Sequence, residues 1–178
     1  MMNKIRKSIL LSLILMVFIS GNVYARDDAA YYEAMNKKVD SELLPDTIKS
    51  SDGVAENVIR SEGLAGATSR ITNEGSGVIG VYAQTRMHIP VDWAYLTIYL
   101  ERWHEELGSW QIKETLEKEF WPEDDADGKI TAVTLSADIS GQPTGYYYRV
   151  RAIHELEYGD NYEVKVTKTD GILITSAP

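Results

Sequence analysis

The chain contains no cysteine among its 178 residues. Disulfide scaffolds, thiolate metal sites and cysteine nucleophiles are therefore excluded. Any folded domain must be held together by an ordinary hydrophobic core. About 150 residues are enough for such a core, because a domain of that size buries roughly two thirds of its unfolded surface.

Positive charge is also scarce. The chain carries 18 lysine and arginine residues against 27 aspartate and glutamate residues, which gives a formal net charge of −9. Binding to a nucleic-acid backbone requires a basic face, and docking on an anionic membrane requires a basic patch. We therefore expect neither nucleic acid nor an anionic membrane surface as a partner.

Motifs that specify a reaction are missing as well. The sequence has no His-Glu-x-x-His metal motif, no Gly-x-Ser-x-Gly nucleophile elbow and no glycine-rich phosphate loop. The histidines His88, His104 and His154 are far apart, so a zinc site would need separate strands to converge. His154 shares the alternation of Val150 and Ala152, and we expect it in the core or at its rim. No catalytic residue and no cofactor is predicted.

Carboxylates offer one enzymatic alternative. A glycosidase needs two of them about 5–10 Å apart across a sugar cleft. A short hairpin makes no deep cleft, and alternating charges usually protect an edge strand from aggregation. We therefore favour a non-catalytic protein and keep a secreted hydrolase as the alternative, with candidate carboxylates at Glu101, Glu105, Glu106, Glu114, Glu117 and Glu119.

Residues 1–25 have the pattern of a signal peptide. A basic start with Lys4, Arg6 and Lys7 precedes an apolar run over 9–19, and Val23 and Ala25 suit cleavage before Arg26. The alternative is an uncleaved anchor, but the run is shorter than the roughly 20 residues that a membrane span needs. Cleavage would leave an exported chain without a membrane span, and its net charge would change from −9 to −12.

Residues 26–66 are polar and lack the alternation of strands. The stretch 29–39 can form one or two helical turns, and Pro45 and Asp52-Gly53 prevent anything longer. We interpret 26–66 as a mobile or loosely docked arm. The alternative is that this arm docks on the domain through Tyr31, Tyr32, Leu43 and Leu44.

Residues 67–178 read as a domain of strands. The clearest alternation lies in 145–156, where Tyr148, Val150 and Ala152 share one side of an extended chain. Helix competes with strand over 113–118, but the short connection at 107–109 favours a hairpin. About seven strands with regular turn signals predict an all-β, antiparallel immunoglobulin-like β-sandwich. The expected strands are 68–72, 78–88, 94–104, 110–120, 130–139, 145–156 and 162–174.

The stretch from Pro143 to Ala152 resembles the penultimate strand of fibronectin type III and related immunoglobulin-like domains. In those families a tyrosine at the start of this strand donates a hydrogen bond backward to form a tyrosine corner. The resemblance assigns that role to Tyr146. The expected second strand lacks the usual tryptophan, and no cysteine pair is present, so the broader immunoglobulin-like class is the safer assignment.

The whole chain also resembles small secreted proteins of clostridia and related Gram-positive bacteria, a family without an assigned function. This resemblance implies export from a Gram-positive cell but no mechanism. The stretches that carry it are 77–83, 91–94, 142–149 and 169–173.

An acidic loop follows the fourth expected strand. Glu123, Asp125 and Asp127, with Gly128 and an aliphatic residue at 130, match the front half of an EF-hand-type calcium loop. Position 12 of such a loop should supply a bidentate carboxylate, yet the chain has threonine there. We favour a solvated acidic turn and keep calcium binding as the alternative.

The last pattern is aromatic. If the third and sixth expected strands are neighbours, their outer positions form one face of tyrosine, tryptophan and arginine. Exposed rows of such residues mark contacts with proteins or glycans, although cross-strand packing beneath a docked arm would need the same residues. We expect a secreted binding module for a surface protein or glycan, with a structural envelope or matrix protein as a further alternative. The candidate ligand-binding residues are Tyr95, Tyr99, Trp103, Tyr147, Arg149 and Arg151.

Overall fold

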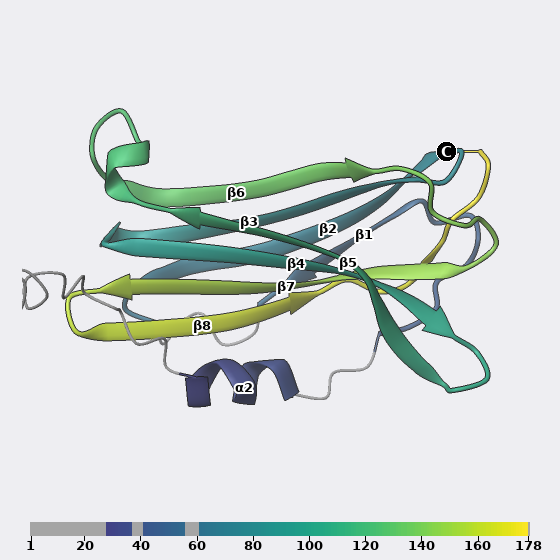
Figure 1. The fold of residues 1–178 in the computed structure, drawn as a ribbon, viewed down its shortest axis with the longest axis horizontal. Helices are drawn as coiled ribbons and strands as arrows, with labels where there is room; N and C mark the ends of the chain where they lie inside the picture. The colour runs from purple at the N-terminus through teal and green to yellow at the C-terminus, as the bar shows by residue number, and fades with distance from the viewer. Residues whose placement is uncertain (1–27, 37–40, 56–60, 178) are drawn as a thin grey trace, which may run out of the picture.

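The computed structural model of the protein describes residues 28–36, 41–55 and 61–177. These residues form two antiparallel sheets that pack face to face as an immunoglobulin-like β-sandwich, as the sequence predicts (Figure 1). The predicted signal peptide lies outside the described residues. Among the helices that are described, none has the length and apolar character needed to span a membrane.

The first sheet has the strand order β1-β2-β3-β6, and all its neighbours are antiparallel. A tight turn with positive φ angles at Gly75, Ser76 and Gly77 joins β2 to β3. The strands of this sheet are β1 (Ser50–Val54), β2 (Leu64–Gly75), β3 (Val78–Val91) and β6 (Ile130–Ile139).

The second sheet has the order β5-β4-β7-β8. The chain breaks after β8, and the short β9 continues the pairing along β7, so the single strand expected over 162–174 is divided in two. Strand, not helix, is found over 113–118, as predicted. The strands are β4 (Trp93–His104), β5 (Ser109–Phe120), β7 (Tyr147–Tyr158), β8 (Asn161–Lys168) and β9 (Ile172–Leu173).

The core lies between the sheets and is built from the inward positions that alternation predicts. Ile79, Val81 and Ala83 of β3 are buried, as are Leu96, Ile98 and Leu100 of β4. Burying aliphatic side chains of this size stabilises a fold by about 1.5–3 kcal/mol each. The core therefore replaces the disulfides that this chain cannot form.

His154 lies within this core and is fully buried, as expected. Its Nδ1 atom is 2.8 Å from Thr85 Oγ1 and its Nε2 atom is 2.9 Å from Thr167 Oγ1. A neutral imidazole has one donor and one acceptor nitrogen, and two hydroxyl groups can satisfy both. Burial lowers the pKa of His154 from 6.5 to about 3.

The tyrosine corner is formed by a different residue from the one that the resemblance assigns. The hydroxyl group of Tyr148 donates to the carbonyl oxygen of Pro143 over 3.2 Å, and Tyr148 is fully buried. Tyr146 is 47% exposed and lies beneath the guanidinium group of Arg102. The assignment to Tyr146 is wrong by two residues, because β7 enters the core only at Tyr148.

The segment before residue 67 takes part in the fold. α2 (Asp28–Asn36) confirms the predicted helical turns and packs against β8 (Figure 1). Residues 42–44 then pair with Gly171 at the break between β8 and β9. β1 follows and joins the other sheet. Two strands thus begin inside the range 26–66, where the sequence shows only a polar arm.

Candidate interaction surface

The outer face of the β5-β4-β7-β8 sheet carries the residues that the aromatic pattern singles out. β4 and β7 are neighbours, so Tyr99 lies opposite Arg151 and Glu101 opposite Arg149. Residues opposite each other in a sheet project from the same face. The structure therefore brings the predicted tyrosine and arginine residues together.

A network of charges forms the centre of this face. Nε of Arg149 donates to Glu101 Oε2 over 2.7 Å, and Nε of Arg151 donates to Glu101 Oε1 over 2.8 Å. The Glu101 side chain is only 5% exposed. Removing one partner of such a buried pair costs about 3–5 kcal/mol, since it leaves a buried charge uncompensated.

Both guanidinium groups also lie over aromatic rings. Arg151 is 4.6 Å from the ring centroid of Tyr99, and Arg149 is 4.6 Å from that of Trp110. Each contact adds an attraction between the cation and the ring quadrupole. Each of the two arginines thus contacts both the Glu101 carboxylate and an aromatic ring.

The N-terminal segment covers the centre of the face. The Tyr31 hydroxyl of α2 is 3.1 Å from the Tyr99 hydroxyl. Burial raises the pKa of Tyr99, and the hydrogen bond with Tyr31 raises it further. Ser41 Oγ accepts a bond from Nη1 of Arg149 over 2.9 Å and donates to the carbonyl oxygen of Thr169 over 2.8 Å.

The expected exposure of this face is therefore wrong at its centre. Tyr99 and Arg149 are each 8% exposed, which leaves no surface for a ligand. The alternative of a docked arm describes this region, with Tyr31 on Tyr99 and Leu44 packed against the core. Tyr32 does not take part in the docking, since it is 60% exposed.

One end of the same face is only partly covered, with the Trp110 ring lying against Gly171. Trp103 of β4 lies opposite Trp110 of β5, and their rings meet edge to face with centroids 5.4 Å apart. Both tryptophans are half-buried. Leu107 at the hairpin turn and Ile112 beyond it are 61% and 48% exposed. The β4–β5 hairpin extends away from the sandwich at this end (Figure 1).

The opposite end has a second aromatic pair. Trp93 and Tyr95 stack with ring centroids 5.7 Å apart and planes 10° from parallel. Nε1 of Trp93 donates to Glu119 Oε1 over 2.6 Å. Tyr147, the remaining candidate, is half-buried and pairs with Leu173 of β9. The six candidates thus divide among a covered centre and two ends, and they do not form one continuous binding face.

The acidic loop does not gather its side chains around one point. Nowhere in the described part of the chain do three or more histidine, aspartate or glutamate side chains form a group that could hold a metal ion. Glu123 belongs to the short 3-10 helix η2 (Pro122–Asp124), and Asp125 and Asp127 lie in the turn after it. The Asp127 carboxylate accepts the backbone N–H of Lys129 over 3.1 Å. This is the arrangement of an acidic turn.

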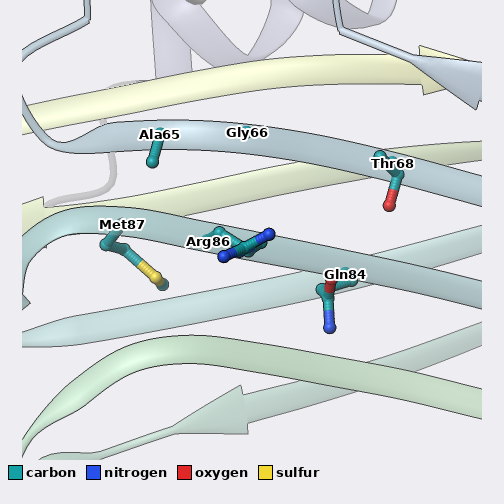
Figure 2. A pocket seen from close by; sticks show the side chains of 6 residues that line it. All are labelled: Ala65, Gly66, Thr68, Gln84, Arg86 and Met87. Carbon is teal, nitrogen blue, oxygen red and sulfur yellow. The ribbon is translucent and has the colours of Figure 1, made fainter.

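A hollow of about 400 Å³ lies on β2 and β3 of the other sheet (Figure 2). It occurs where the β2–β3 register shifts between Leu64 and Gly66, and no atom lies within 4 Å of where a Gly66 Cβ would be. Its lining offers one charged group, the guanidinium of Arg86. One cation in a shallow hollow does not specify a ligand.

Sequence reasoning missed Trp110, Leu107 and Ile112. It placed Trp110 in a strand but did not pair it with Trp103, because the register of a hairpin depends on where its turn lies. A hairpin centred on 106–107 places residues 103 and 110 opposite each other. The turn predicted at 107–109 is centred on residue 108 and would place 103 opposite 113, so the pair becomes visible only with the observed turn at 105–108.

Comparisons of the chain with protein-family models, with curated proteins and with solved structures found no match.

Proposed function

We propose that the protein is a secreted, non-catalytic binding module of a Gram-positive cell, and that it holds a surface protein through the end of its β4–β5 hairpin. The observation that carries the proposal is the apolar and aromatic group formed by the half-buried Trp103 and Trp110 with the exposed Leu107 and Ile112, named here the hairpin patch. Contiguous exposed apolar groups on a soluble domain mark interaction sites.

The composition of the hairpin patch favours a protein over a glycan. A sugar ring stacks on an aromatic face that is open to solvent, yet Arg149 lies over the ring of Trp110. Tryptophan, flanked by aliphatic side chains and a nearby arginine, is the composition of protein hot spots. Glycan binding remains the competing outcome of the experiment below.

The hydrolase alternative loses one of its candidates. Glu101 accepts hydrogen bonds from two arginines and is buried beneath the N-terminal segment, so it has no access to a substrate. Secretion is supported by the N-terminal sequence pattern, with its basic start and short apolar run.

The experiment measures binding of the labelled protein to an envelope preparation from a Gram-positive bacterium. The variant Trp103→Ala should bind about 30-fold more weakly, the effect of losing a hot spot worth about 2 kcal/mol. Leu107→Ser should weaken binding in the same direction. Val54→Ser is the matched control, because Val54 is a 68% exposed aliphatic residue on β1 of the other sheet.

Treatment of the envelope separates the ligand classes. Protease treatment should abolish binding, whereas periodate oxidation of glycans should leave it intact. Loss of binding after periodate alone would replace the protein ligand with a glycan. Equal binding by Leu107→Ser, Val54→Ser and the unchanged protein would remove the hairpin patch as the site.

A further inference from the structure

Each sheet of the sandwich has two outer strands, and three of these four are protected against pairing with another chain. β1 has only five residues, and α2 packs against β8. β5 carries alternating charges and has a register irregularity opposite Leu100 and Glu101. Short length, cover, charge and bulges are the ways in which proteins protect edge strands.

Within the described residues, β6 is the least protected of the four outer strands. It runs for ten residues, Ile130–Ile139, and its sequence contains no lysine, arginine or proline and a single charge at Asp138. Its pairing with β3 is regular from Ile139 to Ala132, and the register shifts only beyond Ala132, toward Ile130. The backbone of β6 from Ala132 to Ile139, on the side away from β3, therefore offers a row of hydrogen-bonding groups to a further strand.

The core beneath this edge is incompletely covered. Leu135, Ala137 and Ile139 of β6 project inward but are only half-buried, and so are Leu116 and Phe120 of β5 in the facing sheet. An added strand would remove these apolar groups from water. The gain in burial supplies a driving force beyond the backbone hydrogen bonds.

We propose that β6 pairs antiparallel with β6 of a second copy, which joins two four-stranded sheets into one of eight strands. A two-fold axis through Leu135 would place Leu135 against the Leu135 of the second copy and Asp138 against its Ala132. Inward residues then face inward residues across the axis, as a continuous sheet requires.

Charge complementarity favours a second copy as the occupant. Ala132 lies opposite Arg86 of β3, so each Asp138 would face a small alanine with an arginine directly behind it. Asp138 of one copy would lie two strand spacings, roughly 10 Å, from Arg86 of the other. The long side chain of Arg86 can span this distance by passing over the small side chain of Ala132. The symmetry produces this ion pair twice.

Arg86 is free to make that contact. Its other neighbour in the sheet is Gly66, which has no side chain, and Figure 2 shows Arg86 on β3 beside it. The side chain is exposed, and no salt bridge to it occurs within the described residues. Reorientation toward the β6 edge would therefore break no ion pair in that part of the chain.

The test is sedimentation of the full chain from about 1 µM to 1 mM, a range that detects weak and moderate self-association. Salt near 0.15 M screens the repulsion between two acidic copies. We expect a monomer–dimer equilibrium. Ala132→Asp, which places two like charges opposite each other, should raise the dimer Kd by about tenfold or more.

Two variants make the result specific. Ser50→Asp introduces the same charge at an exposed residue of β1, the opposite edge strand of this sheet, and should leave the Kd unchanged. The double variant Ala132→Asp with Asp138→Lys restores opposite charges across the axis and should recover the dimer. A protein that stays monomeric throughout, or a dimer that is indifferent to Ala132→Asp, would overturn the proposal.

Discussion

At the scale of single residues, the structure places a titratable group where water does not reach. His154 is fully buried between two threonine hydroxyls, and burial lowers its pKa to about 3. The unfolded chain takes up a proton near pH 6.5, but the folded protein does not do so until about pH 3. The free energy of unfolding must therefore fall as the pH falls through this window.

The expected slope is about 1.4 kcal/mol per pH unit for one proton, once the pH is well below 6.5. Urea unfolding between about pH 7 and pH 5 measures it. The carboxylates add their own slope, so His154→Gln serves as the reference. Near pH 5, the free energy of unfolding of His154→Gln should fall less steeply with falling pH, by about 1.4 kcal/mol per pH unit. Identical slopes in the two proteins would contradict a buried neutral histidine.

The tyrosine corner gives a second prediction for single residues. Tyr148→Phe removes the hydrogen bond to the carbonyl oxygen of Pro143 and should lower the free energy of unfolding by about 1 kcal/mol. Tyr146→Phe is the matched control and should change it by less than about 0.5 kcal/mol. Denaturant titration measures both free energies of unfolding. A larger loss in Tyr146→Phe than in Tyr148→Phe would mean that Tyr146 forms the tyrosine corner.

The two tyrosines also show what sequence patterns can provide. Alternation places Tyr146 and Tyr148 on the same side of an extended chain, but β7 begins only at Tyr147. It cannot tell at which residue the strand enters the space between the sheets. That point is set by the packing of the two sheets, which buries Tyr148 and leaves Tyr146 47% exposed.

At the scale of elements, β1 depends on a glycine. A Cβ atom at Gly53 would lie 2.1 Å from the carbonyl oxygen of Lys168, at the end of β8. Backbone in that position cannot move aside cheaply. Gly53→Ala should therefore lower the free energy of unfolding by about 2 kcal/mol or more, because β1 must shift away from β8.

Gly66 supplies the control for this prediction. It lies in β2, and no atom is within 4 Å of where its Cβ would be. Gly66→Ala should be neutral or slightly stabilising, since alanine restricts the unfolded chain more than glycine does. Thermal unfolding of both variants compares them directly, and equal effects would mean that the contact between β1 and β8 does not constrain the fold.

β1 is also the element that sequence patterns missed. Its residues, Ser50–Val54, contain serine, aspartate and glycine, which are more typical of turns than of strands. The strand forms because β2 offers a complete row of partners, from Thr72 to Thr68. Strands such as β3 alternate clearly because one face lies on the core, so their positions could be predicted within a few residues, whereas β5 and β8 alternate less clearly.

At the scale of the whole molecule, the N-terminal segment decides which surface is available. The sequence predicted the aromatic and arginine residues of one sheet face, and the structure brings Tyr99, Arg149 and Arg151 together there. It also buries their centre under Tyr31 and Ser41. Composition could not foresee this cover, because a polar segment can equally dock on a polar network or remain in solvent.

The hairpin patch and the β6 edge lie on different elements. The proposed partner of the hairpin patch is a surface protein, and that of β6 is a second copy of the chain. A dimer joined through β6 would carry two hairpin patches, and so two copies of the binding site. Binding to a surface that displays many partner molecules would then gain avidity without any new contact. Ala132→Asp should therefore weaken attachment to an envelope more than it weakens capture of a single soluble partner.

The most direct test of the proposed function is photo-crosslinking from the hairpin on an intact Gram-positive envelope. A photoreactive amino acid at Leu107, which is 61% exposed at the turn, should yield a discrete protein adduct. The same amino acid at Val54, which is 68% exposed on β1, should yield none. Equal adducts from both positions, or adducts from Val54 alone, would contradict binding through the hairpin patch.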